Sequence, residues 1–299
     1  MARHIALEIG GVRFSIQAGP GMSLEEPSQA YQPFIRGYEG SAEGADIFIS
    51  VETGGLPETD HLTRVFDGGR SWSLFRAPEG FVISLKPQDI PEPLWVASTD
   101  PGFTRVTLQC SDQILSREDG IIRASNPVCY PLDQILLMNH LAHEKGTIIH
   151  AAGVNACGKG LIFPGKSGAG KTALSRLLSK GARTPILSDD RMVLRKKGET
   201  FQAFGTPWPG DLGVVRNQGV PLRAVLFLHH GKENEIKPIS PGRALEKMMA
   251  VVSVPWYDKR ALLKTLAFCE GLVSGIPQYE LHFRKDGSTV QALEEWMAL

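Results

Sequence analysis

The chain has 299 residues, is 42% hydrophobic and 21% charged, and carries a formal net charge of +0 at pH 7. These values are ordinary for a globular protein with room for two domains, and without a basic stripe they give no reason to expect a nucleic-acid partner. No apolar run approaches 18 residues and the first residues lack the core of a signal peptide, so we expect a cytoplasmic protein with no membrane partner. Four scattered cysteines without C-x-x-C spacing indicate neither a zinc site nor a disulfide framework.

Residues 1–125 favour a β-rich N-terminal domain, with a structural role or a role in substrate recognition. Alternating segments flank the glycines at 10–11, a two-residue hairpin signal. The turn at 77–80 predicts a second hairpin. The stretch 17–44, rich in Gly, Pro, Ser and Glu, is predicted to be a surface loop. Further strands are predicted at 46–51 and 103–108.

The first predicted helix spans 131–145. Pro131 suits a first helical turn, and Gly146 is a stop signal. His140 and His143 are three residues apart and could share a helix face, but no third ligand lies near them in the sequence. A metal site on this helix is therefore not favoured.

An antiparallel hairpin is predicted next, with its turn at 155–159. Its first strand, 147–154, includes His150, and its second strand, 161–164, is an apolar run. From the residues alone, His150 could be a hydrogen-bonded core histidine or part of a site.

The sequence that follows this hairpin fits the pattern G-x-x-x-x-G-K-[ST] at every required position. Its glycines allow several backbone N–H groups to point at one anion, and an apolar stripe at 173–178 predicts a helix whose N-terminus adds a positive dipole. A lysine at this place can bind terminal phosphates, and the hydroxyl after it can bind Mg²⁺. We therefore expect nucleoside-triphosphate binding by Gly165, Lys166, Ser167, Gly168, Ala169, Gly170, Lys171 and Thr172.

Two carboxylates follow the next predicted strand, 186–187. Asp189 and Asp190 stand at its carboxyl end, where open α/β sheets place their ligands. A carboxylate there could bind the Mg²⁺ of a nucleotide, and a second could accept a proton from an attacking hydroxyl. The alternative is an Asp-Asp turn without a chemical role.

The remaining third completes the nucleotide domain. A stiff loop at 205–211, with Trp208, could form a wall of the pocket, and Arg191 and Arg216 are the nearest guanidinium groups that could stabilise a transferred phosphoryl group. A buried strand is expected at 224–228. The other predicted elements are a hairpin of 192–195 with 200–204, helices at 242–252 and 258–272, a strand at 279–283, and a last helix that begins at Ser288.

Three motifs in this order resemble the catalytic domain of the HPr kinase/phosphorylase family: His-Ala-Ala-Gly at 150–153, the loop at 165–172, and Leu-Ser-Asp-Asp at 187–190. The family shares its nucleotide core with ATP-dependent phosphoenolpyruvate carboxykinase. The resemblance implies an α/β (α+β) fold with a P-loop core of mixed sheet and helices over 126–299. It also implies that the loop binds ATP and that Thr172 holds Mg²⁺.

The resemblance assigns roles to three further side chains. Asp189 would contact the metal, Asp190 would be the general base, and His150 would lie near the phosphates. The sequence has no I-R-G-x-G stretch after the aspartates, and its first half differs from the N-terminal domain of HPr kinases. It is therefore more similar to the diverse HPr-kinase-related proteins than to enzymes that act on HPr.

Three functions follow as hypotheses. The first is an ATP- and Mg²⁺-dependent kinase that phosphorylates a hydroxyl, with serine of a peptide, a protein or a small molecule as the expected acceptor. The second is carboxykinase-like or pyrophosphate-linked phosphotransfer. The third is a nucleotide-dependent binding module that switches a partner without catalysis. Because the resembled family forms hexamers, a homo-oligomer is also expected.

Overall fold

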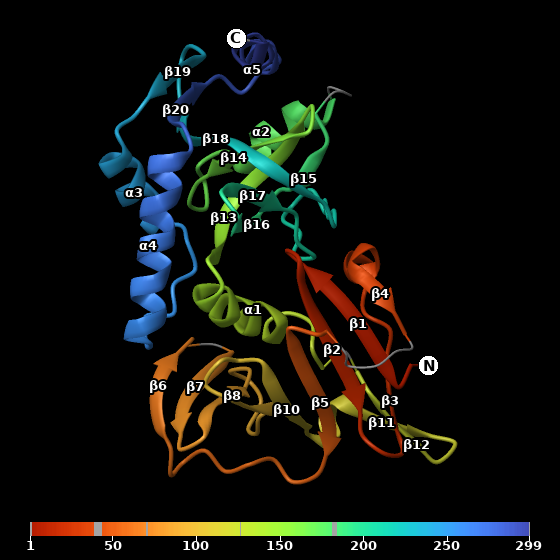
Figure 1. The fold of residues 1–299 in the computed structure, drawn as a ribbon. Helices are drawn as coiled ribbons and strands as arrows, with labels where there is room; N and C mark the ends of the chain where they lie inside the picture. Colours follow the sequence, from red (N-terminus) through yellow and green to blue (C-terminus); the bar gives the residue numbers. More distant parts are fainter. Residues whose placement is uncertain (1, 39–43, 70, 126, 181–183, 299) are drawn as a thin grey trace. The chain divides into compact units, whose positions relative to one another are not determined.

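The computed structural model describes residues 2–38, 44–69, 71–125, 127–180 and 184–298, and Figure 1 gives the order of their elements. They divide into two compact units: the first comprises the residues up to Glu8 with Val12–His140, and the second comprises Ile9–Gly11 with Leu141–Leu299. Both units contain large β-sheets, and five α-helices occur in the described part of the chain. The fold is therefore mixed, with much more sheet than helix. None of the described helices is both long and apolar enough to cross a membrane.

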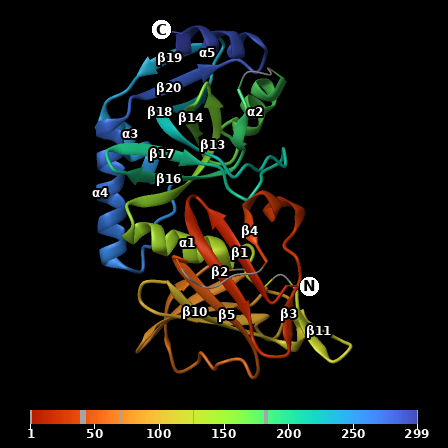
Figure 2. The same cartoon turned by 45° about the vertical axis from the view of Figure 1, so that its right-hand side comes forward.

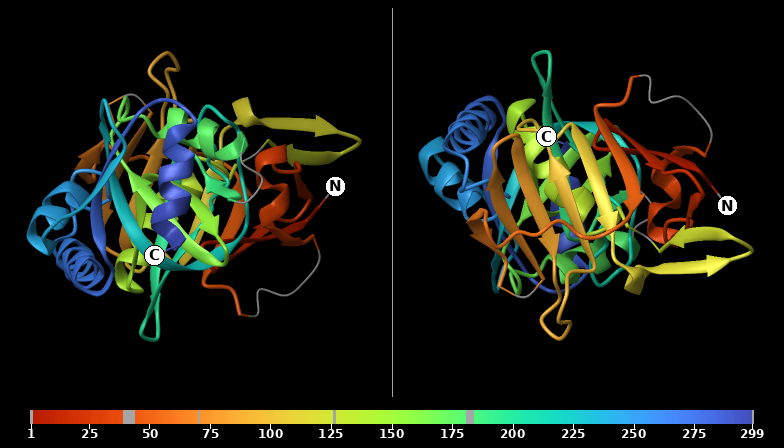
Figure 3. Two further views of the ribbon diagram at one scale, coloured as in Figure 1. Left: turned by 90° about the horizontal axis from the view of Figure 1, so that it is seen from above. Right: turned by 90° about the horizontal axis from the view of Figure 1, so that it is seen from below.

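The first unit is built on a sheet of nine strands. The right panel of Figure 3 shows this sheet from below. Its interior strands β2, β5 and β10 are parallel, whereas β10, β9, β8, β7 and β6 form an antiparallel meander. In order across the sheet the strands are β4 (Ile35–Gly37), β1 (His4–Ile9), β2 (Val12–Ala18), β5 (Ile47–Thr53), β10 (Arg105–Cys110), β9 (Trp95–Thr99), β8 (Gly80–Leu85), β7 (Trp72–Ala77) and β6 (Thr63–Asp67). A small second sheet contains β11 (Leu115–Glu118), β12 (Ile121–Ala124) and β3 (Met22–Leu24).

The two hairpins predicted in this unit are confirmed. β1 pairs with β2 across Gly10 and Gly11, which have φ of 61° and 71°, and β7 pairs with β8. The predicted surface loop at 17–44 is wrong for its described part. That part contains β3, the 3₁₀-helix η1 (Gln29–Phe34) and β4, and it buries Tyr31 and Phe34. Two aromatic side chains supply enough apolar area to anchor a segment rich in loop-forming residues. The only other 3₁₀-helix in the described chain is η2 (Asp112–Ile114).

Helix α1 (Leu132–His143) is the first α-helix of the described residues, as predicted. Asp133 in its first turn is fully buried and accepts a hydrogen bond of 2.7 Å from the Tyr31 hydroxyl. Burial and the nearby Asp133 carboxylate raise the pKa of Tyr31 far above its usual value, so the phenol stays protonated as the donor.

The second unit contains a sheet whose long strands β13 and β18 each pair with several neighbours. Strands β14, β18 and β20 are parallel to one another, and β13 is antiparallel to both β14 and β15. Strand β15 therefore points the same way as β14, so the carboxyl ends of these four strands meet at one edge of the sheet. The strands are β13 (Gly146–Ala156), β14 (Lys159–Pro164), β15 (Ile186–Ser188), β16 (Arg191–Lys197), β17 (Thr200–Phe204), β18 (Gly219–His230), β19 (Glu235–Pro238) and β20 (Gln278–Phe283).

Helices pack on both faces of this sheet (Figure 2). Along β18, Val225 and Phe227 join the core under α3 and α4, whereas Leu226 and Leu228 join the core under α2 and α5. This alternation follows from the two-residue period of a strand, and it confirms a strand buried on both faces. The helices are α2 (Lys171–Lys180), α3 (Pro241–Met249), α4 (Lys259–Gly275) and α5 (Ser288–Ala298).

Candidate functional site

The loop that connects β14 to α2 has a backbone that requires its glycines. Gly168 and Gly170 have φ of 84° and 102°, in the region that side chains disfavour. A Cβ at Gly170 would lie 2.7 Å from Cζ of Phe283, and a Cβ at Gly165 would lie 2.6 Å from Cβ of Ala169. Substitution at either glycine would therefore force the loop to change shape.

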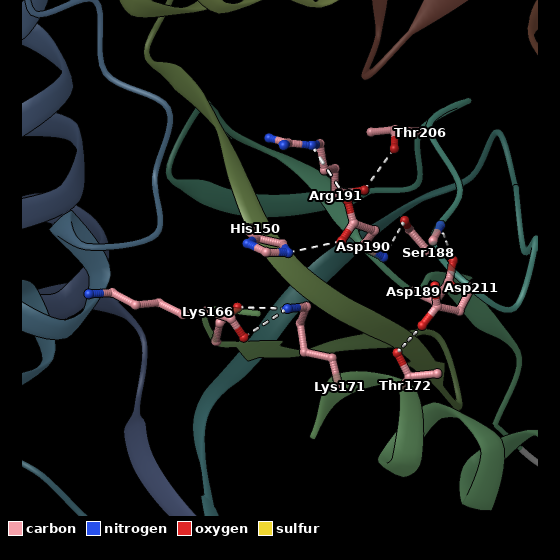
Figure 4. Close-up of polar contacts among 12 residues, drawn as sticks. His150, Lys166, Lys171, Thr172, Ser188, Asp189, Asp190, Arg191, Thr206 and Asp211 are labelled. Atoms are coloured by element: carbon pink, nitrogen blue, oxygen red, sulfur yellow. Dashed lines mark hydrogen bonds and ion pairs between the residues drawn. The ribbon is translucent and has the colours of Figure 1, made fainter. Parts of the chain in front are cut away.

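Lys171 begins α2 and bends back over the loop (Figure 4). Its Nζ donates to the carbonyl oxygens of Gly165 at 2.8 Å and Lys166 at 3.2 Å, and the residue is only 7% exposed. Burial lowers the pKa of Lys171, the Asp190 carboxylate raises it, and the Arg191 guanidinium lowers it. Lys171 is therefore a buried cation at the centre of the loop, and none of the carboxylates that the structure describes is bonded to it directly.

Lys166 has a different orientation from Lys171. Figure 4 shows its side chain extending away from Lys171 and Asp190. The side chain of Lys166 therefore takes no part in the arrangement around Asp190, although its carbonyl does bind Lys171.

His150 and Asp190 form a pair beside the loop. His150 Nε2 lies 2.9 Å from Asp190 Oδ1, and Asp190 Oδ2 lies 3.5 Å from Nε of Arg191. The His150 hydrogen bond is the largest cause of the lowered pKa of Asp190; burial opposes it, and the charges of Arg191 and Lys171 add to it. Asp190 is thus held as a carboxylate of fixed orientation.

The backbone at His150 fixes this pair relative to the loop. His150 is the partner of Arg191 across β13 and β16, and its carbonyl accepts from the Gly165 N–H at 3.2 Å. The next residue, Ala151, donates its N–H to the Asp190 carbonyl at 3.0 Å. Sheet register therefore brings residues 40 positions apart into contact.

Asp189 has a different environment from its neighbour. It is 2% exposed, and its two carboxylate oxygens accept from the backbone N–H groups of Gly210 at 2.9 Å and Leu212 at 2.7 Å. A Cβ at Gly210 would lie 2.9 Å from Asp189 Oδ2, so only glycine permits this close approach. Asp189 therefore fastens the segment at 205–212 to the end of β15.

That segment adds Asp211, a side chain that the sequence analysis did not assign to the site. Its Oδ2 lies 3.3 Å from Oγ1 of Thr172, on the first turn of α2. The rigid Pro-Trp-Pro-Gly sequence before Asp211 was a signal for a fixed loop, but it gave no reason to select the carboxylate. Trp208 itself is buried at 5% exposure and does not line the cavity, but Gly210 and Asp211 of the same loop do, so the loop forms part of the wall.

These groups surround one cavity of about 330 Å³. The cavity is lined by predicted residues of the loop, of β13 and of the end of β15, and by residues of the segment at 205–212. Its lining residues are His150, Ser167, Gly168, Gly170, Lys171, Thr172, Asp189, Asp190, Gly210 and Asp211. Arg216 is not among them, because its Nε donates to the Ile186 carbonyl at 2.9 Å.

The donors in this cavity suit a metal that arrives with a phosphate ligand. Within the described part of the chain, no three His, Cys, Asp or Glu side chains are grouped so as to hold a metal ion by themselves. Mg²⁺ commonly uses one or two carboxylates together with phosphate oxygens and water. Thr172 and Asp211, with Asp189 beside them, fit that donor set.

Comparisons with known proteins match this chain to a family model and to distantly similar solved structures. The family model "SynChlorMet cassette protein ScmC" matches residues 128–297. No curated protein matches the chain. Among solved structures, the Hpr(Ser) kinase/phosphatase from Coxiella burnetii aligns at 11% identity over 51% of this chain and 99% of that chain, with a TM-score of 0.30. A TM-score this low does not establish a common fold.

Proposed function

We propose that this chain, which belongs to the SynChlorMet cassette protein ScmC family, is an ATP- and Mg²⁺-dependent phosphotransferase that phosphorylates a hydroxyl group. One observation carries the proposal. The glycine-rich loop with the buried Lys171 lines the same cavity as Asp190, whose carboxylate is hydrogen-bonded to His150. Binding of a nucleotide requires only the loop. The oriented Asp190 is the feature that favours transfer to an acceptor.

The loop and Lys171 would bind the phosphates of the donor. Backbone N–H groups at the N-terminus of α2 attract anions, and the Lys171 ammonium can exchange its two carbonyl partners for phosphate oxygens. Those carbonyls are neutral acceptors, so exchange for a charged acceptor is favourable. Lys171 would thereby hold the phosphoryl group that is transferred.

Asp190 would orient the acceptor hydroxyl and accept its proton. A lowered pKa makes Asp190 a weak base, but phosphoryl transfer depends mainly on positioning, because little bond formation to the nucleophile precedes the transition state. His150 would keep the carboxylate pointed into the cavity. The oxygen of the acceptor forms a bond to the γ-phosphorus, the bond to the β–γ bridging oxygen breaks, and the products are ADP, a phosphate ester and a proton.

Thr172 and Asp211 would hold Mg²⁺ through oxygen atoms. Asp189, which the resemblance assigned to the metal, already has a backbone N–H on each oxygen, so we assign it first to positioning Asp211. Its remaining lone pairs still permit a metal contact. When bound, the metal would neutralise charge on the phosphates of the donor.

The acceptor class is tested with γ-labelled ATP. The full chain is incubated with labelled ATP, Mg²⁺ and a fractionated cell extract, and each labelled species is identified; a serine phosphate ester in a peptide, protein or small molecule is expected. Asp190→Asn, which keeps the loop intact, is the matched control and should label the acceptor far more slowly than the unchanged protein.

Three results would contradict the proposal. Tight ATP binding without a labelled acceptor in any fraction would support a binding module. Release of pyrophosphate or of a keto acid would support the carboxykinase-like alternative. Equal labelling by Asp190→Asn would remove Asp190 from the reaction.

A further inference from the structure

A second cavity in the same unit has a different composition and is lined by different elements. It measures about 380 Å³, within the range of small-molecule sites. Phe201 of β17 and Phe268 of α4, both 7% exposed, form its floor, with ring centroids 5.8 Å apart at an interplanar angle of 66°. The exposed part of this edge-to-face pair gives a flat apolar group an aromatic surface to contact.

One face of α4 completes the apolar surface. Lys264, Ala267, Phe268 and Gly271 are spaced three or four residues apart, so they lie along one side of the helix. Gly271 has no side chain to fill the space above Phe201: a Cβ there would reach Phe201 Cζ only at 3.9 Å, which is ordinary contact. The absence of a side chain at residue 271 therefore leaves this space open, and the helix does not require a glycine at this position.

The rim of the cavity is basic and carries no acidic side chain. Lys145, Lys196, Lys264 and His143 line it. Lys196 lies 3.2 Å from Glu199 and 5.7 Å above the Phe201 ring. Among the residues that the structure describes, no carboxylate forms an ion pair with Lys145 or Lys264.

Lys264 is tied to the cavity through His143. Its Nζ lies 3.4 Å from Nδ1 of His143. Burial, then the Lys264 ammonium and Arg260, lower the pKa of His143, whereas Asp258 and Glu144 raise it. A neutral His143 can accept from Lys264, which leaves two further donors on that ammonium for a ligand.

We propose that this cavity binds a small aromatic anion, with its ring on Phe201 and Phe268 and its carboxylate, sulfonate or phosphate between Lys145 and Lys264. The aromatic floor supplies the affinity for the ring, and two lysines without carboxylate partners supply the preference for an anion. The site requires no nucleotide, so it is tested independently of phosphotransfer.

The probe is 8-anilinonaphthalene-1-sulfonate, compared with N-phenyl-1-naphthylamine, its analogue without the sulfonate. Fluorescence titration and calorimetry of the full chain, without nucleotide, should give one saturable site that prefers the sulfonate probe at least fivefold. Lys145→Met and Lys264→Met should each weaken the sulfonate probe about fivefold and change the neutral probe less than twofold.

Gly271→Leu should abolish binding of both probes, because the new side chain fills the cavity, and it should not lower the melting temperature. Gly242→Leu is the matched control, since a Cβ at Gly242 meets no atom within 4 Å, and it should bind both probes normally. Unchanged binding by Gly271→Leu would overturn the location. Equal weakening of both probes by the lysine variants would overturn the anion preference.

Discussion

The two cavities of the second unit have similar volumes, about 330 and 380 Å³, but they are built in opposite ways. The first is formed by a loop whose residues, the buried Lys171 among them, are consecutive in the sequence, with carboxylates from other segments beside it. The second is formed by residues of α1, β16, β17 and α4, together with Lys145 between α1 and β13, and it has an aromatic floor and a lysine rim. A site made from local sequence can therefore be recognised from a motif, whereas a site made by packing can be recognised only from the fold.

The largest expected effect is at the loop. Lys171→Ala should lower kcat for phosphoryl transfer by about 10³-fold, because the other lysine of the loop, Lys166, extends away from the cavity and cannot stabilise charge on the transferred group. Circular dichroism should show a folded protein, since the lost bonds are two lysine contacts to carbonyls. Lys171→Arg tests geometry at constant charge; turnover of Lys171→Ala near the unchanged rate would remove the loop from catalysis.

Removal of the acceptor-side carboxylate should have the next largest effect. Asp190→Asn keeps the size of the side chain but removes the proton acceptor, and it should lower kcat by about 10²–10³-fold with little change in ATP affinity. The measurement is kcat in steady state beside nucleotide binding by calorimetry. A rise in the dissociation constant with an unchanged kcat would instead assign Asp190 to nucleotide binding.

Gly210→Ala should separate the role of Asp189 from that of Asp211. The new Cβ would lie 2.9 Å from Asp189 Oδ2, so Asp189 and the segment must move apart, and we expect the contact of Asp211 with Thr172 to weaken. We expect kcat/KM to fall about tenfold and the Mg²⁺ concentration for half-maximal rate to rise. Gly242→Ala, at an open position of α3, is the control and should change neither quantity.

His150→Ala should act mainly through pH. The His150 hydrogen bond is the first cause that lowers the pKa of Asp190, so its loss raises that pKa toward the usual value. The acid limb of the kcat/KM profile should therefore move to higher pH, and stability that the charged Asp190 contributes should be lost earlier as pH falls. His143→Ala, in the second cavity, should leave the acid limb in place.

The smallest expected effect is that of second-cavity variants on phosphotransfer in the first cavity. Lys145→Met and Lys264→Met, which should weaken an aromatic anion, should leave phosphotransfer within about twofold of the unchanged protein, because neither residue lines the first cavity. Parallel assays of transfer and of probe binding on the same preparations make the comparison. A loss of transfer in both variants would show that the cavities are coupled.

The sequence predicted those features that depend on neighbouring residues. The strand, loop and helix over 160–180 follow from local apolar patterns and glycine positions, and the acidic pair follows a three-residue strand as expected. The contact of His150 with Asp190 was not predicted, because the family resemblance only put His150 near the phosphates. Its cause is the register of β13 with β16, which is set by long-range pairing and has no local sequence signal.

Other features were missed for the same physical reason. Asp211 reaches Thr172 because two backbone N–H groups bind Asp189, a contact that residue spacing does not reveal. The segment at 17–44 looked like a loop by composition, yet Tyr31 and Phe34 anchor it in the core. In each case a tertiary contact decided between conformations that the local sequence left open.

The hydrogen bonds of strand β13 determine which parts of the second unit can unfold locally and which cannot. The backbone of His150 and Ala151 is bonded at once to Val251, to Gly165 and to Asp190, so the machinery of the first cavity is fastened to the centre of its sheet. Amide hydrogen exchange at these positions should therefore require unfolding of most of the unit, while the amides that Asp189 holds at Gly210 and Leu212 should exchange by opening of their segment alone. The His150–Asp190 pair is therefore a fixed wall of the first cavity.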